Sequence, residues 1–294
     1  MQRGFSDLEF ANRVKLAQIL MEKNDIGALL LTTEPDVRYF TGFLTQFWQS
    51  PTRPWFLVIP VSGKPIAVIP SIGQALMNAT WIDDVRTWSS PDMFDDGIGL
   101  LIDTLLEVVS NGKVAVPDGA ETHIRMPYSD VQRLSNSVLI SSDMGIMREL
   151  RMVKSDIEIN KIRYACQIAS DAFGAVKGFA KVGMTQSEIN RQFQSTCLNS
   201  GADSVPYVAM GLGACGYFDV ISPATDIRAQ TGDILMLDTG LMWDGYFCDF
   251  DRNFALGNPD PRAASAHACL IDATAAGLEA AVVGATAADI FHAM

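Results

Sequence analysis

Three aspartates stand in one of the most apolar stretches of this chain, residues 235–255, which reads LMLDTGLMWDGYFCDFDRNFA. They are Asp238, Asp249 and Asp251. Burying an unpaired carboxylate is costly, and neighbouring like charges raise one another's pKa unless a positive charge lies among them. A bound cation is the simplest resolution of this conflict. A site made of carboxylates alone suits Mg²⁺, Ca²⁺ or Mn²⁺, whereas histidine would be needed to favour the later transition metals.

The spacing of these residues predicts a β-hairpin with Asp244-Gly245 as its loop, because Asp-Gly between alternating apolar segments is a strong hairpin signal. Three cross-strand pairs follow from that loop: Trp243 with Tyr246, Gly240 with Asp249, and Asp238 with Asp251. Directly paired residues share a face, and so do residues two apart on one strand. The three carboxylates are therefore predicted to converge on one side of the hairpin.

Apolar residues accompany the aspartates on that side and also occupy the other side. The first set is Ile234, Met236 and Phe247, and the second is Leu235, Leu237, Tyr246, Cys248 and Phe250. We therefore expect protein to cover both faces of the hairpin. Arg252 points to the opposite face in this register, so it could neutralise the aspartates only if a β-bulge turned it inward. A solvent-exposed edge hairpin with ordinary acidic residues is the alternative.

An alternating α/β pattern precedes the hairpin, and we assign residues 1–145 to an α/β domain. Helical spacing is seen over residues 8–24 and about 97–110. Strands are predicted at 26–33, at 54–70 as a pair around Ser62-Gly63, at 113–117 and at 137–142.

A second domain, residues 146–294, starts with a long amphipathic helix behind a capping box formed by Ser155 and Glu158. Residues 175–189 resemble residues 276–290, and each copy reads as a helix, a glycine stop and a capped helix start. Chance similarity between two capped helices is one explanation. Duplication is the other, and it predicts that the natural chain continues beyond Met294, because strands follow the first copy.

These segments resemble the creatinase and prolidase family of pita-bread fold enzymes, which includes Xaa-Pro aminopeptidases and dipeptidases. GDILMLDTGLMWDGYFCDFDRNF is similar to the family's GD-hydrophobic-D-x-G segment followed by GY-x-x-D-x-(T/S)-R-T. MRELRMVKSDIEINKIRYACQIASDAF looks like its linker and first helix, and DVRYFTGF resembles its N-x-RYLTGF segment. The implied fold is an α/β N-terminal domain followed by an α+β pita-bread catalytic domain, incomplete at its C-terminus.

The resemblance also implies a metal-dependent hydrolase. Asp238 and Asp249 would bind one or two divalent metal ions (Mn, Fe, Co or Zn), with Asp249 bridging two. A hydroxide on the metal would then attack the carbonyl carbon of a C–N bond. The family's remaining ligands, a histidine and two glutamates, would lie beyond residue 294. A small molecule or short peptide is the implied substrate, and a homodimer is the implied assembly.

Two departures from the family's pattern affect the predicted activity. The peptidases' substrate-facing histidine falls near Ile221, and the chain has no histidine between His123 and His267. Asp251 replaces a threonine or serine, so it would be a further ligand, change the charge balance of the metal, or pair with Arg252. Three functions stay open: an Xaa-Pro peptidase, a non-peptidase acting on a small C–N or sulfonium compound like creatinase, ectoine hydrolase or a lyase relative, and a binding protein on a decayed enzyme fold.

Two further segments contain candidate substrate contacts. Residues 210–219, MGLGACGYFD, are predicted to form a loop at the mouth of the site, with Tyr217 and Asp219 as contacts. This segment lacks the G-x-x-x-x-G-K-(S/T) pattern of a phosphate-binding loop. Residues 43–55, FLTQFWQSPTRPW, include Trp48, the third candidate, in a loop that would either reach a neighbouring subunit's pocket or serve as an exposed packing loop.

Composition argues against several other classes of protein. The net charge of -12, without a run of lysine or arginine, disfavours a nucleic-acid partner. The polar N-terminus MQRGFSDLEFANRVK and the absence of 18 consecutive apolar residues predict a cytoplasmic protein with no membrane partner. The five cysteines contain no CxxC pair, which favours reduced, mostly buried thiols.

Overall fold

The computed structural model of the protein describes residues 2–50, 52–109 and 112–294. The chain divides into two compact units, Gln2–Ile157 and Glu158–Met294, each with its own hydrophobic core. The domain boundary expected after residue 145 stays a prediction. By packing, the helix α6 (Ile146–Met152) contacts α1 (Asp7–Lys23) and therefore belongs with the first unit.

The first unit is built around a mixed six-stranded sheet with the order β4-β3-β2-β1-β5-β6. Its strands are β1 (Ile26–Leu31), β2 (Phe56–Pro60), β3 (Ile66–Pro70), β4 (Asp84–Trp88), β5 (Lys113–Val116) and β6 (Ile140–Ser142). Its other helices are α2 (Glu34–Thr41), α3 (Gln74–Met77), α4 (Ile98–Val108) and α5 (Tyr128–Ser137), with short 3₁₀ turns at Gln46–Gln49 and Ser71–Gly73.

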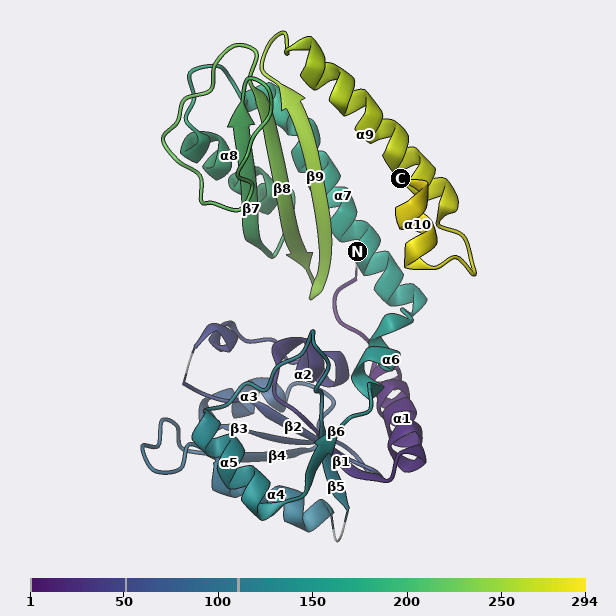
Figure 1. Ribbon diagram of the computed structural model, residues 1–294. Coiled ribbons are helices and arrows are strands. Elements are labelled where there is room, and N and C mark those ends of the chain that lie inside the picture. Colours follow the sequence, from purple (N-terminus) through teal and green to yellow (C-terminus); the bar gives the residue numbers. More distant parts are fainter. Residues whose placement is uncertain (1, 51, 110–111) are drawn as a thin grey trace. The chain divides into compact units, whose positions relative to one another are not determined.

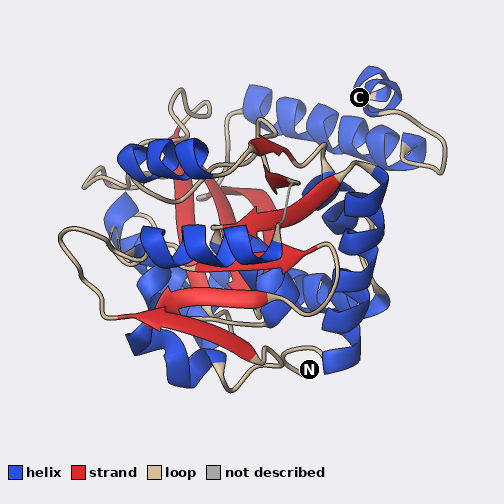
Figure 2. Ribbon diagram, turned by 90° about the horizontal axis from the view of Figure 1, so that it is seen from below, coloured by secondary structure: helices blue, strands red, loops and turns tan. Residues whose placement is uncertain are grey.

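Helices cover both faces of this sheet, as the blue and red ribbons of Figure 2 show. Alternate residues of each strand enter different cores: Leu29 and Leu57 pack with α1 residues, whereas Leu30 and Val58 pack with α4 residues. This two-sided burial explains why the strands are nearly continuous apolar runs. The α/β domain expected from the sequence is confirmed. The helix predicted over about 97–110 is seen as α4, Ile98–Val108, and residue 110 of the prediction lies outside the described residues.

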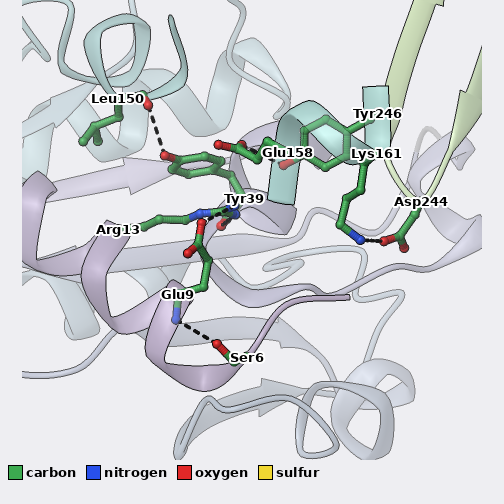
Figure 3. A network of polar contacts seen from close by, with 9 residues as sticks. All are labelled: Ser6, Glu9, Arg13, Tyr39, Leu150, Glu158, Lys161, Asp244 and Tyr246. Atoms are coloured by element: carbon green, nitrogen blue, oxygen red, sulfur yellow. Dashed lines mark hydrogen bonds and ion pairs between the residues drawn. The ribbon is translucent and has the colours of Figure 1, made fainter. Parts of the chain in front are cut away.

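A buried arginine links elements within the first unit. Arg13 is 4% exposed, and its guanidinium donates hydrogen bonds to the carbonyl of Tyr39 at 2.7 Å and to Glu9 Oε1 at 3.2 Å. The hydroxyl of Tyr39 in turn donates to the carbonyl of Leu150 at 3.1 Å (Figure 3). These bonds join α1, α2 and α6, and the partners compensate for burying the charge.

The second unit contains an antiparallel sheet of β7 (Ser204–Gly213), β8 (Ile234–Trp243) and β9 (Tyr246–Ala255) (Figure 1). Its helices are α7 (Asp156–Phe179), α8 (Gln186–Asn199), α9 (Pro261–Ala280) and α10 (Ala287–Ala293). The similar segments 175–189 and 276–290 adopt the same local structure, because Thr185 and Thr286 both form capping boxes at the starts of α8 and α10. Among the described helices, none is both long and hydrophobic enough to span a lipid bilayer.

One face of this sheet is buried, and the other is open. Phe173 of α7 and Phe193 of α8 pack with Leu237 and Leu241 of β8 in a single core. On the opposite face, Phe247, Asp249 and Asp251 are exposed, whereas Asp238 is half-buried and Met236 is buried. In the described part of the chain, the expectation that protein covers both faces is therefore wrong around Asp249 and Asp251, and it holds on this face for Met236. The physical reason is that α7 and α8 pack on the same side of the sheet.

Charged residues anchor the turn of the hairpin to α7. Lys161 is 1% exposed, pairs with the carboxylate of Asp244, and lies 5.5 Å from the centroid of the Trp243 ring (Figure 3). The hydroxyl of Tyr246 donates to Glu158 Oε1 at 2.7 Å. A buried charge requires such partners, because it has lost its hydration.

Replacing Asp244 with asparagine removes a negative charge that pairs with the buried Lys161 and preserves a residue type that tolerates the left-handed backbone, φ 50°, at this position. We expect the free energy of unfolding in urea to fall by about 3–5 kcal/mol, because Lys161 keeps a buried charge. Asp83→Asn is the matched control, since the Lys64–Asp83 pair is 62% and 68% exposed. That change should cost less than about 1 kcal/mol, and equal losses in both variants would contradict the prediction.

Thiol reactivity tests the packing of α8 and β9. Burial raises the pKa of Cys197 to about 11, and burial likewise raises the pKa of Cys248. A raised pKa lowers the fraction of reactive thiolate at pH 8. Iodoacetamide at pH 8 should therefore alkylate the exposed Cys215 and Cys269 before Cys197, as measured by peptide mass spectrometry. Alkylation of Cys197 in the native protein at the rate of Cys269 would disprove this packing.

Candidate metal centre

The β8–β9 hairpin has the register expected from its sequence. Asp244 and Gly245 form the loop with φ of 50° and 82°, which matches the left-handed conformations of a type I′ turn. The strands pair Trp243 with Tyr246, Gly240 with Asp249, and Asp238 with Asp251. The three aspartates therefore share one face of the sheet, as predicted. We call Asp238, Asp249 and Asp251 the acidic face residues.

A tyrosine from the third strand completes this arrangement. Tyr207 of β7 pairs with Gly240, which places its side chain on the same face as the aspartates. Its hydroxyl lies 2.9 Å from Asp249 Oδ1 and 3.4 Å from Asp238 Oδ1. Because an ionised carboxylate can only accept, the phenol O–H is the donor in this contact. Tyr207 was not among the residues that the sequence identified.

Gly240 makes room for the aromatic rings on this face. A Cβ atom at position 240 would lie 1.9 Å from Cζ of Phe247, so a larger residue would displace that ring. The rings of Phe247 and Tyr207 have centroids 6.4 Å apart. Asp249 pairs directly with Gly240, and the absence of a side chain there leaves space beside its carboxylate.

The three negatively charged aspartates on this face lie close enough to shift the pKa of Asp238. Partial burial raises the pKa of Asp238, and the charges of Asp249 and Asp251 raise it further. Burial also raises the pKa of Tyr207, as do its hydrogen bond to Asp249 and the two neighbouring negative charges. Both shifts favour the neutral forms of these groups. A cation near the carboxylates would act in the opposite direction.

Arg252 does not neutralise the acidic face residues. It pairs with Leu237, so it lies on the core side as the register predicted. Its guanidinium lies 5.1 Å from the centroid of the Phe250 ring and donates to the backbone carbonyl of Asp251. Within the described residues, no ion pair connects a basic side chain to any of the three carboxylates.

The donor chemistry fits part of a metal site. Carboxylate oxygens from adjacent strands are suitable ligands for hard divalent cations. However, no group of three or more His, Cys, Asp and Glu side chains in the described part of the chain could hold a metal ion. The acidic face residues thus supply ligands from one side, and a complete coordination shell would need further donors.

The three candidate substrate contacts occupy different environments. Tyr217 is half-buried, and its hydroxyl donates to Asn253 Oδ1 at 3.0 Å. Asn253 lies on the same face of the sheet as Asp251. Asp219 is exposed and caps its own turn, accepting from the backbone N–H groups of Ile221 and Ser222 at 3.0 and 3.1 Å. Trp48 is 6% exposed in the core of the first unit. Substrate roles for all three stay predictions.

The segment 210–219 is not entirely a loop. Residues 210–213 extend β7 and pair with β8. The side chain of Met210 points to the buried face of the sheet and packs in the core. Cys215, Gly216 and Tyr217 contribute to a cavity of about 510 Å³ beside the strand ends. Tyr217, Asn253 and His267 are among its lining residues. This cavity adjoins the acidic face through Asn253, which is two residues from Asp251 on β9.

Comparison with known proteins assigns both units. Residues 13–153 match the creatinase/prolidase N-terminal domain, and residues 160–294 match metallopeptidase family M24. The chain belongs to the creatinase and prolidase family. Its architecture is that of the family, an α/β N-terminal domain joined to a pita-bread domain.

The relatives of this chain include proteins named as dipeptidases. The chain is 26% identical to the probable dipeptidase PepE of Mycobacterium tuberculosis, in a match that covers 98% of the chain and 75% of the relative. It is 23% identical to an Xaa-Pro dipeptidase of Pyrococcus horikoshii, with coverage of 95% and 74%. The crystal structure of dipeptidase PepE from Mycobacterium ulcerans has a TM-score of 0.81 at 26% identity, over 98% of this chain and 76% of that one.

The raised pKa of Asp238 predicts a pH-dependent stability in the chelator-treated protein. A carboxyl whose folded-state pKa is raised stabilises the fold while it is protonated, and this stabilisation is lost as the pH rises through that pKa. Asparagine does not ionise. Asp238→Asn should therefore gain unfolding free energy relative to wild type as the pH is raised from 4 to 7, measured by urea denaturation.

Asp219→Asn provides a control of opposite sign. Hydrogen bonds from its own turn lower the pKa of Asp219, so its carboxylate stabilises the fold at neutral pH and loses this effect on acidification. That variant should become less stable than wild type at pH 7. A difference between Asp238→Asn and wild type that does not change with pH would refute the electrostatic interpretation.

Proposed function

We propose that this protein is a divalent-metal-dependent hydrolase that cleaves a peptide-like C–N bond, as an Xaa-Pro dipeptidase does. Asp238 and Asp249 are the proposed metal ligands, and Asp251 is a candidate third. The observation that carries the proposal is the convergence of these carboxylates on one face without a basic partner among the described residues. Membership of a metallopeptidase family supports it.

The chain's own residues would perform defined tasks in this reaction. Asp238 and Asp249 would hold the cation from two adjacent strands, and the turn at Asp244 fixes their register. A divalent cation supplies Lewis acidity and lowers the pKa of bound water. Tyr217 and the adjoining cavity would contact the substrate, because they lie beside Asn253 on the same sheet face.

A non-peptide substrate is the second candidate function. The peptidases' substrate-facing histidine would fall near Ile221, and that residue lies in an exposed turn capped by Asp219. The absent histidine is the observation that favours this second candidate, whereas the retained carboxylates argue against a metal-free enzyme of the creatinase type. Parallel assays with Xaa-Pro dipeptides and with small compatible solutes would distinguish these substrates.

Metal content tests the proposed ligands. In the full-length protein, Asp238→Asn combined with Asp249→Asn should lose most of the bound Mn²⁺, Fe²⁺, Co²⁺ or Zn²⁺, because the substitution removes both ligand charges. Hydrolysis of the active substrate should fall together with the metal content, because the metal activates the attacking water. Elemental analysis by mass spectrometry measures the metal.

The matched control replaces two exposed acids of the same unit, Asp226→Asn combined with Asp272→Asn. This variant undergoes the same change of net charge and should retain wild-type metal content. Full metal occupancy in the Asp238/Asp249 variant would rule out the proposed site. Loss of metal in both variants would point to a general charge effect rather than to specific ligands.

A further inference from the structure

Tyr207 connects the two proposed ligands through one hydroxyl group. It comes from β7, whereas Asp238 lies on β8 and Asp249 on β9, so the contact depends on both strand registers. The hydroxyl lies 2.9 Å from Asp249 Oδ1, a normal hydrogen-bond distance, and 3.4 Å from Asp238 Oδ1. A single phenol therefore touches the facing oxygens of both carboxylates.

This contact limits the orientation of the two carboxylates and leaves some of their oxygen lone pairs free to bind another group. A carboxylate has two oxygens and about four lone-pair sites. The phenol donates its proton to Asp249 Oδ1 at 2.9 Å and lies 3.4 Å from Asp238 Oδ1, which leaves Oδ2 and further lone pairs of both carboxylates available to another partner. The phenol is also the one donor among the described side chains that reaches both carboxylates. A neutral donor orients these charges but does not compensate for them.

Tyr207 is tied to β8 through its backbone and has an aromatic neighbour. Tyr207 pairs with Gly240, whose missing side chain leaves room on this face, and the Phe247 ring lies next to it. The carbonyl of Tyr207 accepts a hydrogen bond from the hydroxyl of the buried Thr239 at 2.8 Å. The backbone of Tyr207 is thus fixed relative to β8, and the ring, although 38% exposed, has the Phe247 ring as a neighbour.

We propose that Tyr207 is a positioning residue that presets the Asp238 and Asp249 carboxylates for a divalent cation. This inference rests on the proposed function and extends it to a residue outside the ligand set. A hydrogen-bonding partner behind a metal ligand fixes the orientation of that ligand, and removing such a partner typically lowers metal affinity 10- to 100-fold.

The test compares Tyr207→Phe with wild type in the full-length, chelator-treated protein. Titration calorimetry with Mn²⁺ should show an affinity roughly 10- to 100-fold weaker in the variant. The visible absorption spectrum of the Co²⁺ form should change, because its d–d bands report the arrangement of the ligands. Adding Mn²⁺ to wild type should also alter the near-ultraviolet absorption of tyrosine, and this signal should be absent from Tyr207→Phe.

Tyr246→Phe is the matched control. It makes the same substitution in the same sheet and also removes a hydroxyl that donates to a carboxylate, Glu158 Oε1 at 2.7 Å, but it lies on the other face. Its Mn²⁺ affinity, Co²⁺ spectrum and tyrosine difference signal should equal those of wild type. Circular dichroism establishes that both variants are folded.

The outcomes separate this inference from the proposed function. If wild type binds Mn²⁺ and Tyr207→Phe binds it equally tightly with an unchanged Co²⁺ spectrum, the positioning role is wrong and the proposed function stands. If wild type binds neither Mn²⁺ nor Co²⁺, the proposed function fails and the inference fails with it. If Tyr207→Phe does not fold, a wild-type tyrosine spectrum unaffected by Mn²⁺ overturns the inference.

Discussion

The candidate site depends on the register of one antiparallel hairpin. Side chains alternate between the faces of a strand, so a slip of one residue would send Asp249 and Asp251 to the buried side. The Asp244-Gly245 turn prevents this slip, because its left-handed backbone fixes which residues pair. Lys161 and Glu158 then anchor the end of the hairpin to α7. The like charges are thus brought together by packing elsewhere in the unit.

The two faces of the sheet explain how the unit can tolerate this cluster. Residues such as Leu237 and Phe193 form a dry core on one side, and this core supplies the hydrophobic stabilisation. The acidic face contributes little to that core, and Asp249 and Asp251 are exposed there. Water screens part of the repulsion between exposed charges. Asp238, which is less exposed, bears more of the electrostatic cost, as its raised pKa indicates.

Local signals in the sequence predicted the hairpin, whereas non-local contacts stayed hidden. The Asp-Gly turn and the alternation around it were sufficient to derive every pair from Asp238–Asp251 to Trp243–Tyr246. Tyr207 escaped notice because a connection of residues 214–233 separates β7 from β8, and no turn motif fixes their register. The burial of the acidic face was predicted wrongly for a related reason. Periodicity shows which residues share a face but does not show where helices will pack.

Two tyrosine–carboxylate contacts in the same sheet show why geometry, rather than residue type, identifies a site. The hydroxyl of Tyr246 donates to Glu158, and the carboxylate of Glu158 is buried at the end of the hairpin near the Lys161–Asp244 ion pair. There the hydrogen bond satisfies a buried polar group, which is a structural task.

Tyr207 makes a similar bond on the open face, to carboxylates that have no described ion-pair partner. Stability alone does not require the Tyr207 phenol to meet the Asp238 and Asp249 carboxylates there, since apolar residues would pack against Phe247 without like-charge repulsion. This arrangement opposes stability, and the local Asp-Gly turn sets the register that brings Asp238 and Asp249 to one face. It is better explained by the ligand that it would bind.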